Sequence, residues 1–158
     1  MPQLPATETA EVAVPPDELF DWFVGSDLSE LLEGYGPLDA VTKTTDQTGP
    51  WDEEGSQRTV HLSGGNTVRQ TVIDCEPPEY FAYRVDGFAA PVGLLSPKAI
   101  SQWRFEPSSE GTAITWTYTH YTDSWLAKLA FYPAALLWEG YMRQIIETVE
   151  RKCEREIG

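Results

Sequence analysis

The sequence has few of the residues that build metal sites and disulfide frameworks. Its 158 residues include two cysteines, Cys75 and Cys153, and two histidines, His61 and His120. No two of these four lie at the spacing of a metal motif, and two isolated cysteines do not make a disulfide framework. We therefore expect two reduced thiols, no metal site and no cofactor.

Positive charge is also scarce. Eleven lysines and arginines stand against 25 acidic residues, which gives a net charge of −14. A field of this sign repels nucleic-acid phosphates and anionic membrane surfaces, so we expect no nucleic-acid partner.

Long hydrophobic runs are missing too. No apolar run is long enough to span a bilayer, and no basic segment followed by an apolar run opens the chain. We expect no stable membrane insertion, no signal peptide and a cytoplasmic location. A monomer and a homodimer both remain open.

The longest periodic pattern lies at 124–158. Its apolar residues recur three and four positions apart, as on one face of a helix: Leu126, Leu129, Ala130, Leu137, Trp138, Tyr141, Met142, Ile145, Ile146, Val149 and Cys153. Pro133 fits a first helical turn better than a helix interior. The pattern predicts a short helix over 124–131, a break or kink at 132–133 and a main helix over 134–156. A main helix about 30 Å long with one apolar face needs a sheet to cover it.

The rest of the chain reads as strands, with two short helices near the start. Alternation at 7–14 predicts a strand, and Pro16 and Asp27 favour helix starts at 16–23 and 27–33. Further strands are predicted at 38–45, 56–63, 66–75, 79–87, 99–106 and 112–121. Successive strands joined by short turns indicate an antiparallel sheet. We expect one α+β domain over 1–158, with about seven strands curved around the C-terminal helix.

Alternation separates two faces of this sheet. One face is rich in threonine and charge, and the other is aromatic and apolar, as in a sheet covered on one side only. The covered side contains large rings and a few polar groups, and with the helix it gives our candidate ligand-binding residues: Arg58, Gln70, Tyr83, Trp103, Trp116, Tyr118, Trp138 and Met142. Such a layer describes a ligand cavity, or a filled core whose polar end meets water.

Segments along nearly the whole chain resemble one known superfamily. They are EVAVPPDELFDWF (11–23), GPW (49–51), GSQRTVHLSGG (55–65), PPEYFAYRV (77–85), WRFEP (103–107), GTAITWTYTH (111–120) and WEGYMRQIIETV (138–149). The sequence is similar to the START-like (SRPBCC) superfamily, in its polyketide cyclase/dehydrase and lipid-transport branch. The resemblance implies a helix-grip fold with a hydrophobic or aromatic small molecule held between sheet and helix. Members of this branch include polyketide cyclases and lipid carriers, so fold does not fix function.

His120 is the candidate catalytic residue, because a histidine titrates near neutral pH. The alternative is a structural histidine. Arg58 can pair with a ligand carboxylate or phenolate, or form a structural ion pair. Tyr83 and Tyr118 can bind a ligand carbonyl or simply pack.

Three functions stay open at this point. The first is binding of a hydrophobic, lipid-like or polyketide-like molecule. The second is a cyclase or dehydratase that moves protons with one acid–base group. The third is a filled core without a ligand. The apolar loop 88–98 is either a gate over the cavity or a loop packed on the core.

Overall fold

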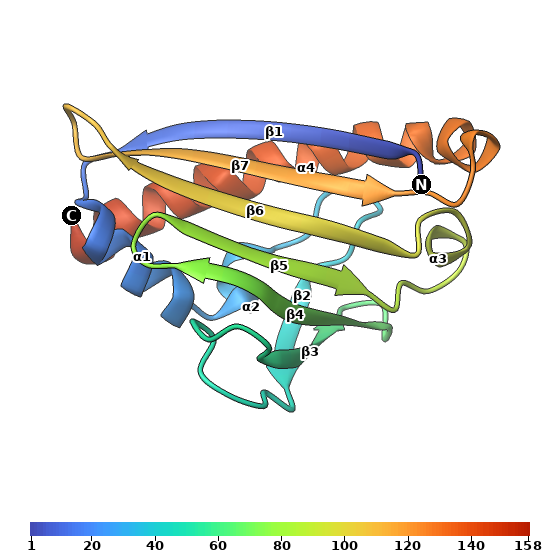
Figure 1. The fold of residues 1–158 in the computed structure, drawn as a ribbon, viewed down its shortest axis with the longest axis horizontal. Coiled ribbons are helices and arrows are strands. Elements are labelled where there is room, and N and C mark those ends of the chain that lie inside the picture. Colours follow the sequence, from blue (N-terminus) through green and yellow to red (C-terminus); the bar gives the residue numbers. More distant parts are fainter.

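The computed structural model describes residues 1–158 and shows a curved antiparallel sheet wrapped around one long helix (Figure 1). Its strands are β1 (Gln3–Val12), β2 (Val41–Thr45), β3 (Gln57–Leu62), β4 (Thr67–Glu76), β5 (Tyr80–Asp86), β6 (Lys98–Pro107) and β7 (Thr112–Tyr121). They lie in the order β1-β7-β6-β5-β4-β3-β2, with every neighbour antiparallel. The predicted α+β helix-grip fold is confirmed.

Strand β1 forms one edge of the sheet and begins earlier than the predicted residue 7. It pairs only with β7, from Gln3 opposite Tyr121 to Val12 opposite Thr112. Pro5 lies inside this strand, opposite Thr119. A proline has no N–H to donate, so an edge strand, which has only one neighbour to bond, tolerates it.

The two predicted faces of the sheet are confirmed. Along β7 the side chains of Ile114, Trp116, Tyr118 and His120 are all buried, between residues that are more exposed or face the other way. A tight hairpin at 63–66 joins β3 to β4, and its Gly65 has a φ of +94°, which glycine adopts at little cost.

Two short helices follow β1, as predicted. Helix α1 (Pro16–Gly25) places Leu19 and Phe20 in the core. Helix α2 (Leu28–Leu31) starts at Asp27, whose carboxylate accepts a hydrogen bond from the Ser29 N–H. The ring of Phe20 packs edge-on against Phe81 and Phe105, which fills the end of the sheet beside α1.

The C-terminal helix differs from its prediction. Helix α4 (Trp125–Ile157) is one continuous helix of 33 residues, capped by the Ser124 side chain, and Pro133 lies inside it. Of the break or kink predicted at 132–133, the break is wrong. Pro133 has no N–H, so the Leu129 carbonyl, four residues earlier, lacks its helical hydrogen-bond donor. Both residues lie on the exposed side of the helix. Water can bond that carbonyl, so packing of the rest of the helix outweighs the lost hydrogen bond.

The first turns of α4 also bury fewer residues than the periodicity predicts. Leu126 is 77% exposed and Leu129 is 71% exposed, with Trp125, Tyr132 and Leu136 beside them on the surface. The helix is apolar on both sides here, and only one side faces the sheet. From Trp138 onward the predicted apolar face is covered.

The loop predicted at 88–98 contains an additional short helix, α3 (Val92–Leu95). This helix lies beside α4 at the end of the sheet opposite α1 (Figure 1). No helix of the protein combines the length and apolarity needed to cross a bilayer.

Candidate functional site

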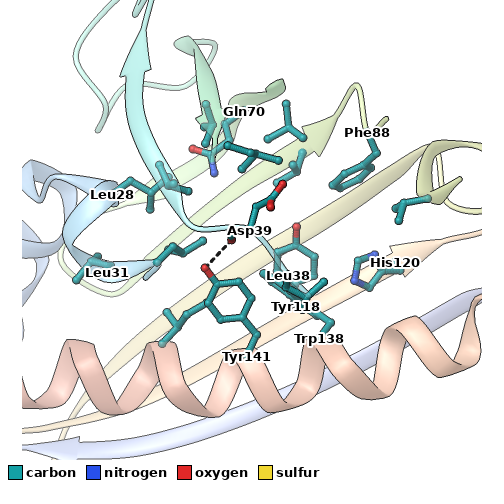
Figure 2. Close-up of a pocket in the computed structure, with 18 of the residues that line it drawn as sticks. Leu28, Leu31, Leu38, Asp39, Gln70, Phe88, Tyr118, His120, Trp138 and Tyr141 are labelled. Atoms are coloured by element: carbon teal, nitrogen blue, oxygen red, sulfur yellow. Dashed lines mark hydrogen bonds between the residues drawn. The ribbon is translucent and has the colours of Figure 1, made fainter. Parts of the chain in front are cut away.

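A cavity of about 340 Å³ lies between the concave face of the sheet, α4, α2 and the loops at 37–39 and 88–92. Hydrophobic residues make up 24 of the 29 that line it. Figure 2 shows their side chains converging from the sheet, from α4 and from the segment around Leu38 and Asp39. The space suits a small molecule with a largely apolar surface.

Side-chain size changes along β6. Strand pairing aligns Ser101 with Tyr83 and Tyr118, and Ala99 with Val85 and His120. Ala99 and Ser101 are small, whereas Trp103 and Phe105 further along β6 are large and pack with Phe23. Phe23 and Trp103 form one end of the cavity, and its lining extends from them to His120 and Phe131.

Seven of the nine candidate residues line this cavity. They are Gln70, Tyr83, Trp103, Trp116, Tyr118, His120 and Trp138. Four strands (β4, β5, β6 and β7) and α4 bring together residues that lie far apart in the sequence. Their functional roles remain predictions.

Met142 does not line the cavity. Its side chain is fully buried, but the cavity-facing residues of α4 include Trp138, Tyr141 and Ile145. One residue turns a helix by about 100°, so Met142 lies on the neighbouring stripe of α4. The prediction treated the two stripes as one.

Arg58 does not line the cavity either. It is only 8% exposed, its guanidinium lies 3.9 Å from the centre of the Trp51 ring, and its Nε donates to Gln70 Oε1 at 2.8 Å. It forms no ion pair. Burial lowers the pKa of Arg58 to about 10. Arg58 instead lines a separate polar pocket, together with Asp21 and Asp52. The predicted structural ion pair is wrong, and contact of Arg58 with a ligand stays a prediction that its place outside the cavity does not support.

His120 lies at the far end of the cavity among aromatic rings. Its ring centre is 4.8 Å from that of Phe131 and 5.0 Å from that of Tyr118. Both ring nitrogens are buried without a hydrogen-bond partner. Burial lowers the pKa of His120 to about 4, so the ring is neutral at pH 7. No carboxylate accompanies it.

The hydroxyl of Tyr118 is a second polar group in the cavity, and Figure 2 shows it turned away from the sheet towards the middle of the cavity. Burial raises the pKa of Tyr118, and the nearby Tyr83 contributes to the rise. Tyr118 therefore presents a neutral hydroxyl group at physiological pH.

The sequence did not reveal the wall formed by the loop after α2. The Tyr141 hydroxyl donates to the Asp39 carbonyl and accepts from the Gly34 N–H, both at 2.9 Å (Figure 2). Gln144 Nε2 donates to the Gly34 carbonyl at 2.8 Å. These bonds hold Leu38 and Asp39 over the cavity. The glycines and the proline at 34–37 indicate a turn in the sequence, but they do not indicate which element the loop contacts.

Other lining residues were also missed. Leu28, Leu31 and Leu32 come from the α2 segment, and Phe88 and Val92 come from the loop around α3. Apolar residues in a loop were the available signal for the second group. No group of three or more metal-ligating side chains occurs in the structure.

A curved antiparallel sheet, a long C-terminal helix and an apolar cavity between them define a helix-grip protein. Residues 3–154 match the family described as polyketide cyclase / dehydrase and lipid transport. The chain belongs to this family. No protein of curated function matches it in sequence.

Solved structures share the fold at low sequence identity. The protein MLL2253 from Mesorhizobium loti has a TM-score of 0.67 at 15% identity, over 97% of this chain and 98% of its own. A norcoclaurine synthase point mutant from Thalictrum flavum, in complex with a transition-state analogue, has a TM-score of 0.70 at 12% identity. The match covers 99% of this chain and 97% of the synthase chain.

The di-domain aromatase/cyclase StfQ of the steffimycin biosynthetic pathway has a TM-score of 0.71 at 13% identity. It matches 97% of this chain and 51% of its own length. At such identities the likeness establishes the fold alone.

Proposed function

We propose that this protein binds a hydrophobic, ring-containing small molecule in the cavity between the sheet and α4. The observation that carries the proposal is the cavity itself, about 340 Å³ in volume and lined largely by apolar and aromatic side chains. Ligand pockets span roughly 300–1,000 Å³, so a compact ligand of a few rings matches its size. The flat rings of Trp116, Tyr118 and Trp138 provide surfaces for stacking.

Native mass spectrometry of protein purified from its own host, followed by denaturing extraction, tests this proposal. We expect a bound small molecule at near-stoichiometric occupancy. Titration of the ligand-free protein with the extracted compound, followed by tryptophan fluorescence, detects a ligand that binds weakly.

Two variants make the location of binding testable. Ala134→Trp places a large ring in the cavity, because Ala134 lines it, whereas Ala135→Trp alters the next residue of α4, which does not line it. We expect binding to be lost in the first variant and kept in the second, with both folded by circular dichroism. Equal binding by the two variants would place the ligand elsewhere.

A second candidate function is catalysis of a cyclisation or dehydration in the same cavity. The observation that favours it is His120, an unpaired imidazole among the cavity aromatics. A neutral imidazole accepts a proton from a bound substrate and returns it within the closed site. The name of the family includes such activities.

His120→Asn separates the two functions once a ligand is known. A carrier changes only in affinity, whereas a cyclase loses turnover while its fold and substrate binding persist. Retained turnover in this variant would remove His120 from the mechanism.

A further inference from the structure

The side-chain amide of Gln70 has an orientation fixed by its neighbour. An arginine side chain has only hydrogen-bond donors. The Gln70 atom that faces Arg58 Nε at 2.8 Å must therefore be the amide oxygen, Oε1. The amide nitrogen, with two N–H donors, is left for the cavity that Gln70 lines. Figure 2 shows Gln70 at the edge of the cavity, across from Tyr118.

The neighbours of Arg58 hold its side chain in the position from which it donates to Gln70. Trp51 stacks on its guanidinium at 3.9 Å, and its charge lies outside the apolar cavity. Strand pairing places Arg58 directly opposite Gln70 in β3 and β4. Arg58 is thus a positioning residue, which acts through Gln70 and does not touch the cavity ligand.

Two tyrosine hydroxyl groups lie on the same side of the cavity. Gln70 pairs with Val85, two residues along β5 from Tyr83, so Gln70 and Tyr83 are diagonal neighbours. Tyr83 and Tyr118 flank Ser101 of β6 in one row across the sheet. Burial and mutual proximity keep the Tyr118 hydroxyl protonated. This wall of the cavity therefore offers hydrogen-bond donors.

The charges around the cavity exclude an anion. Asp39 is the only acidic residue among the lining residues, and no lysine or arginine is among them. A carboxylate or phosphate in the cavity would have no counter-charge, which costs several kcal/mol in an apolar site.

We propose that the cavity selects a neutral ring compound carrying a carbonyl oxygen, which accepts hydrogen bonds from Gln70 Nε2 and a tyrosine hydroxyl. This inference rests on the proposed binding function and adds the chemical class of the ligand. Gln70 is the residue that discriminates, and Arg58 fixes which end of its amide faces the ligand.

Three naphthalene probes test the inference by isothermal titration calorimetry. They are 2-acetylnaphthalene, which carries a neutral ketone, 2-ethylnaphthalene, which has a similar shape without the oxygen, and 2-naphthoate, which is an anion. A net hydrogen bond of about 1 kcal/mol or slightly more corresponds to about tenfold in affinity. We expect the ketone to bind about tenfold more tightly than the hydrocarbon, and the anion to bind most weakly.

Variants of Gln70 test whether the preference for the ketone over the hydrocarbon depends on this side chain. Gln70→Leu removes the donors, so the preference for the ketone should disappear and the two probes should bind with equal affinity. Gln70→Glu keeps the shape and an acceptor for Arg58 but replaces the donors by an oxygen, so the ketone should bind no better than the hydrocarbon. The second variant keeps the test valid if Gln70→Leu fails to fold.

Arg58→Met tests the positioning role. Without the Arg58 donor the Gln70 amide is free to turn, and the ketone-to-hydrocarbon ratio should fall towards one while hydrocarbon affinity is kept. Arg104→Met is the matched control, because Arg104 stacks on Tyr80 and is exposed on the outer face. It should leave the ratio unchanged.

The outcomes separate the inference from the function on which it rests. Equal binding of ketone and hydrocarbon by the unmodified protein overturns the inference and leaves the binding function intact. An unchanged ratio in both Gln70 variants overturns the assignment to Gln70. Binding of none of the three probes contradicts the proposed cavity function, and the inference falls with it.

Discussion

His120 is a buried residue whose polar side-chain atoms have no hydrogen-bond partner. It is 6% exposed, its nitrogens have no partner, and its nearest rings are those of Phe131 and Tyr118. Trp138 Nε1, on α4, is likewise buried without a partner. Unpaired buried polar atoms cost roughly 1–3 kcal/mol each, so they are uncommon unless a site uses them. A ligand group that reaches these atoms would relieve that cost.

The depressed pKa of His120 predicts a pH dependence of stability. In the unfolded chain a histidine titrates near pH 6.5, but in the folded protein the pKa of His120 is about 4. Between these pH values the unfolded state binds more protons than the folded state. The contribution of His120 to the free energy of unfolding is therefore lost as pH falls from about 6.5 to about 4. We expect His120→Asn to lose less free energy of unfolding than the unmodified protein between pH 7.5 and 4.5, by up to about 3 kcal/mol.

Urea unfolding at the two pH values measures this difference. His61→Asn is the matched control, since His61 bonds to Thr45 Oγ1 and is not in the cavity. Its pH dependence should equal that of the unmodified protein. A His120→Asn variant with the same pH dependence would show that His120 is solvated.

At the scale of elements, the contact between α4 and the loop after α2 closes one side of the cavity. Tyr141 and Gln144 bond to the backbone at Gly34 and Asp39, and the Tyr35 ring stacks on Tyr141 with centres 6.1 Å apart. Gly140 permits this approach: a Cβ there would lie 2.5 Å from the Tyr35 hydroxyl oxygen. The loop rests on the helix backbone itself.

Gly140→Ala should therefore destabilise the protein, although alanine is the better helix former. The methyl group must displace the Tyr35 ring and the loop, which we expect to cost about 1–3 kcal/mol and to weaken ligand binding. Chemical unfolding gives the free energy. Gly25→Ala is the control, because a Cβ at Gly25 meets nothing within 4 Å, and it should be neutral or slightly stabilising. Similar effects of the two substitutions would argue against the contact.

Pro133 gives a second prediction for α4. It lies in the interior of a continuous helix and on its exposed side. Pro133→Ala restores the N–H donor and removes the clash of the ring with the preceding turn, so it should stabilise the protein by up to about 3 kcal/mol. The thermal unfolding midpoint measures the gain. A loss of stability would mean that the proline shapes the helix for its packing on α3.

At the scale of the whole molecule, charge sets the response to solution conditions. The net charge is −14, and only three salt bridges are present, all with basic partners that are at least partly exposed. Like charges repel across the surface of the folded state more strongly than along the expanded chain. Repulsion of this kind is screened when the Debye length falls from about 30 Å at 0.01 M salt to a few Å near 1 M.

We accordingly expect sodium chloride to raise the thermal unfolding midpoint at pH 7.5, with most of the rise complete by about 0.5 M. Differential scanning fluorimetry across a salt series measures it. At pH 5, where part of the acidic charge is neutralised, the same series should give a smaller rise. A midpoint that falls with salt would show that attractive ion pairs outweigh the repulsion.

The sequence by itself determined the order of elements and the two faces of the sheet. Alternation in a strand is a local property, so Ile114, Trp116, Tyr118 and His120 could be assigned to the covered side before the fold was known. Turn residues such as those at 63–66 act through their own backbone angles and also follow from sequence. These signals gave the α+β fold and seven of the nine candidate cavity residues.

The tertiary structure decided what depends on several elements at once. Met142 lies outside the cavity because a helix turns about 100° per residue. Arg58 lies outside it because its guanidinium stacks on Trp51 and bonds to Gln70. The continuity of α4 through Pro133 depended on which side faces water. The cavity is enclosed by side chains from the sheet, α2 and α4, and by the loop at 34–39, which bonds to α4. An empty space is the difference between many side-chain volumes from distant segments, and no local pattern encodes that difference.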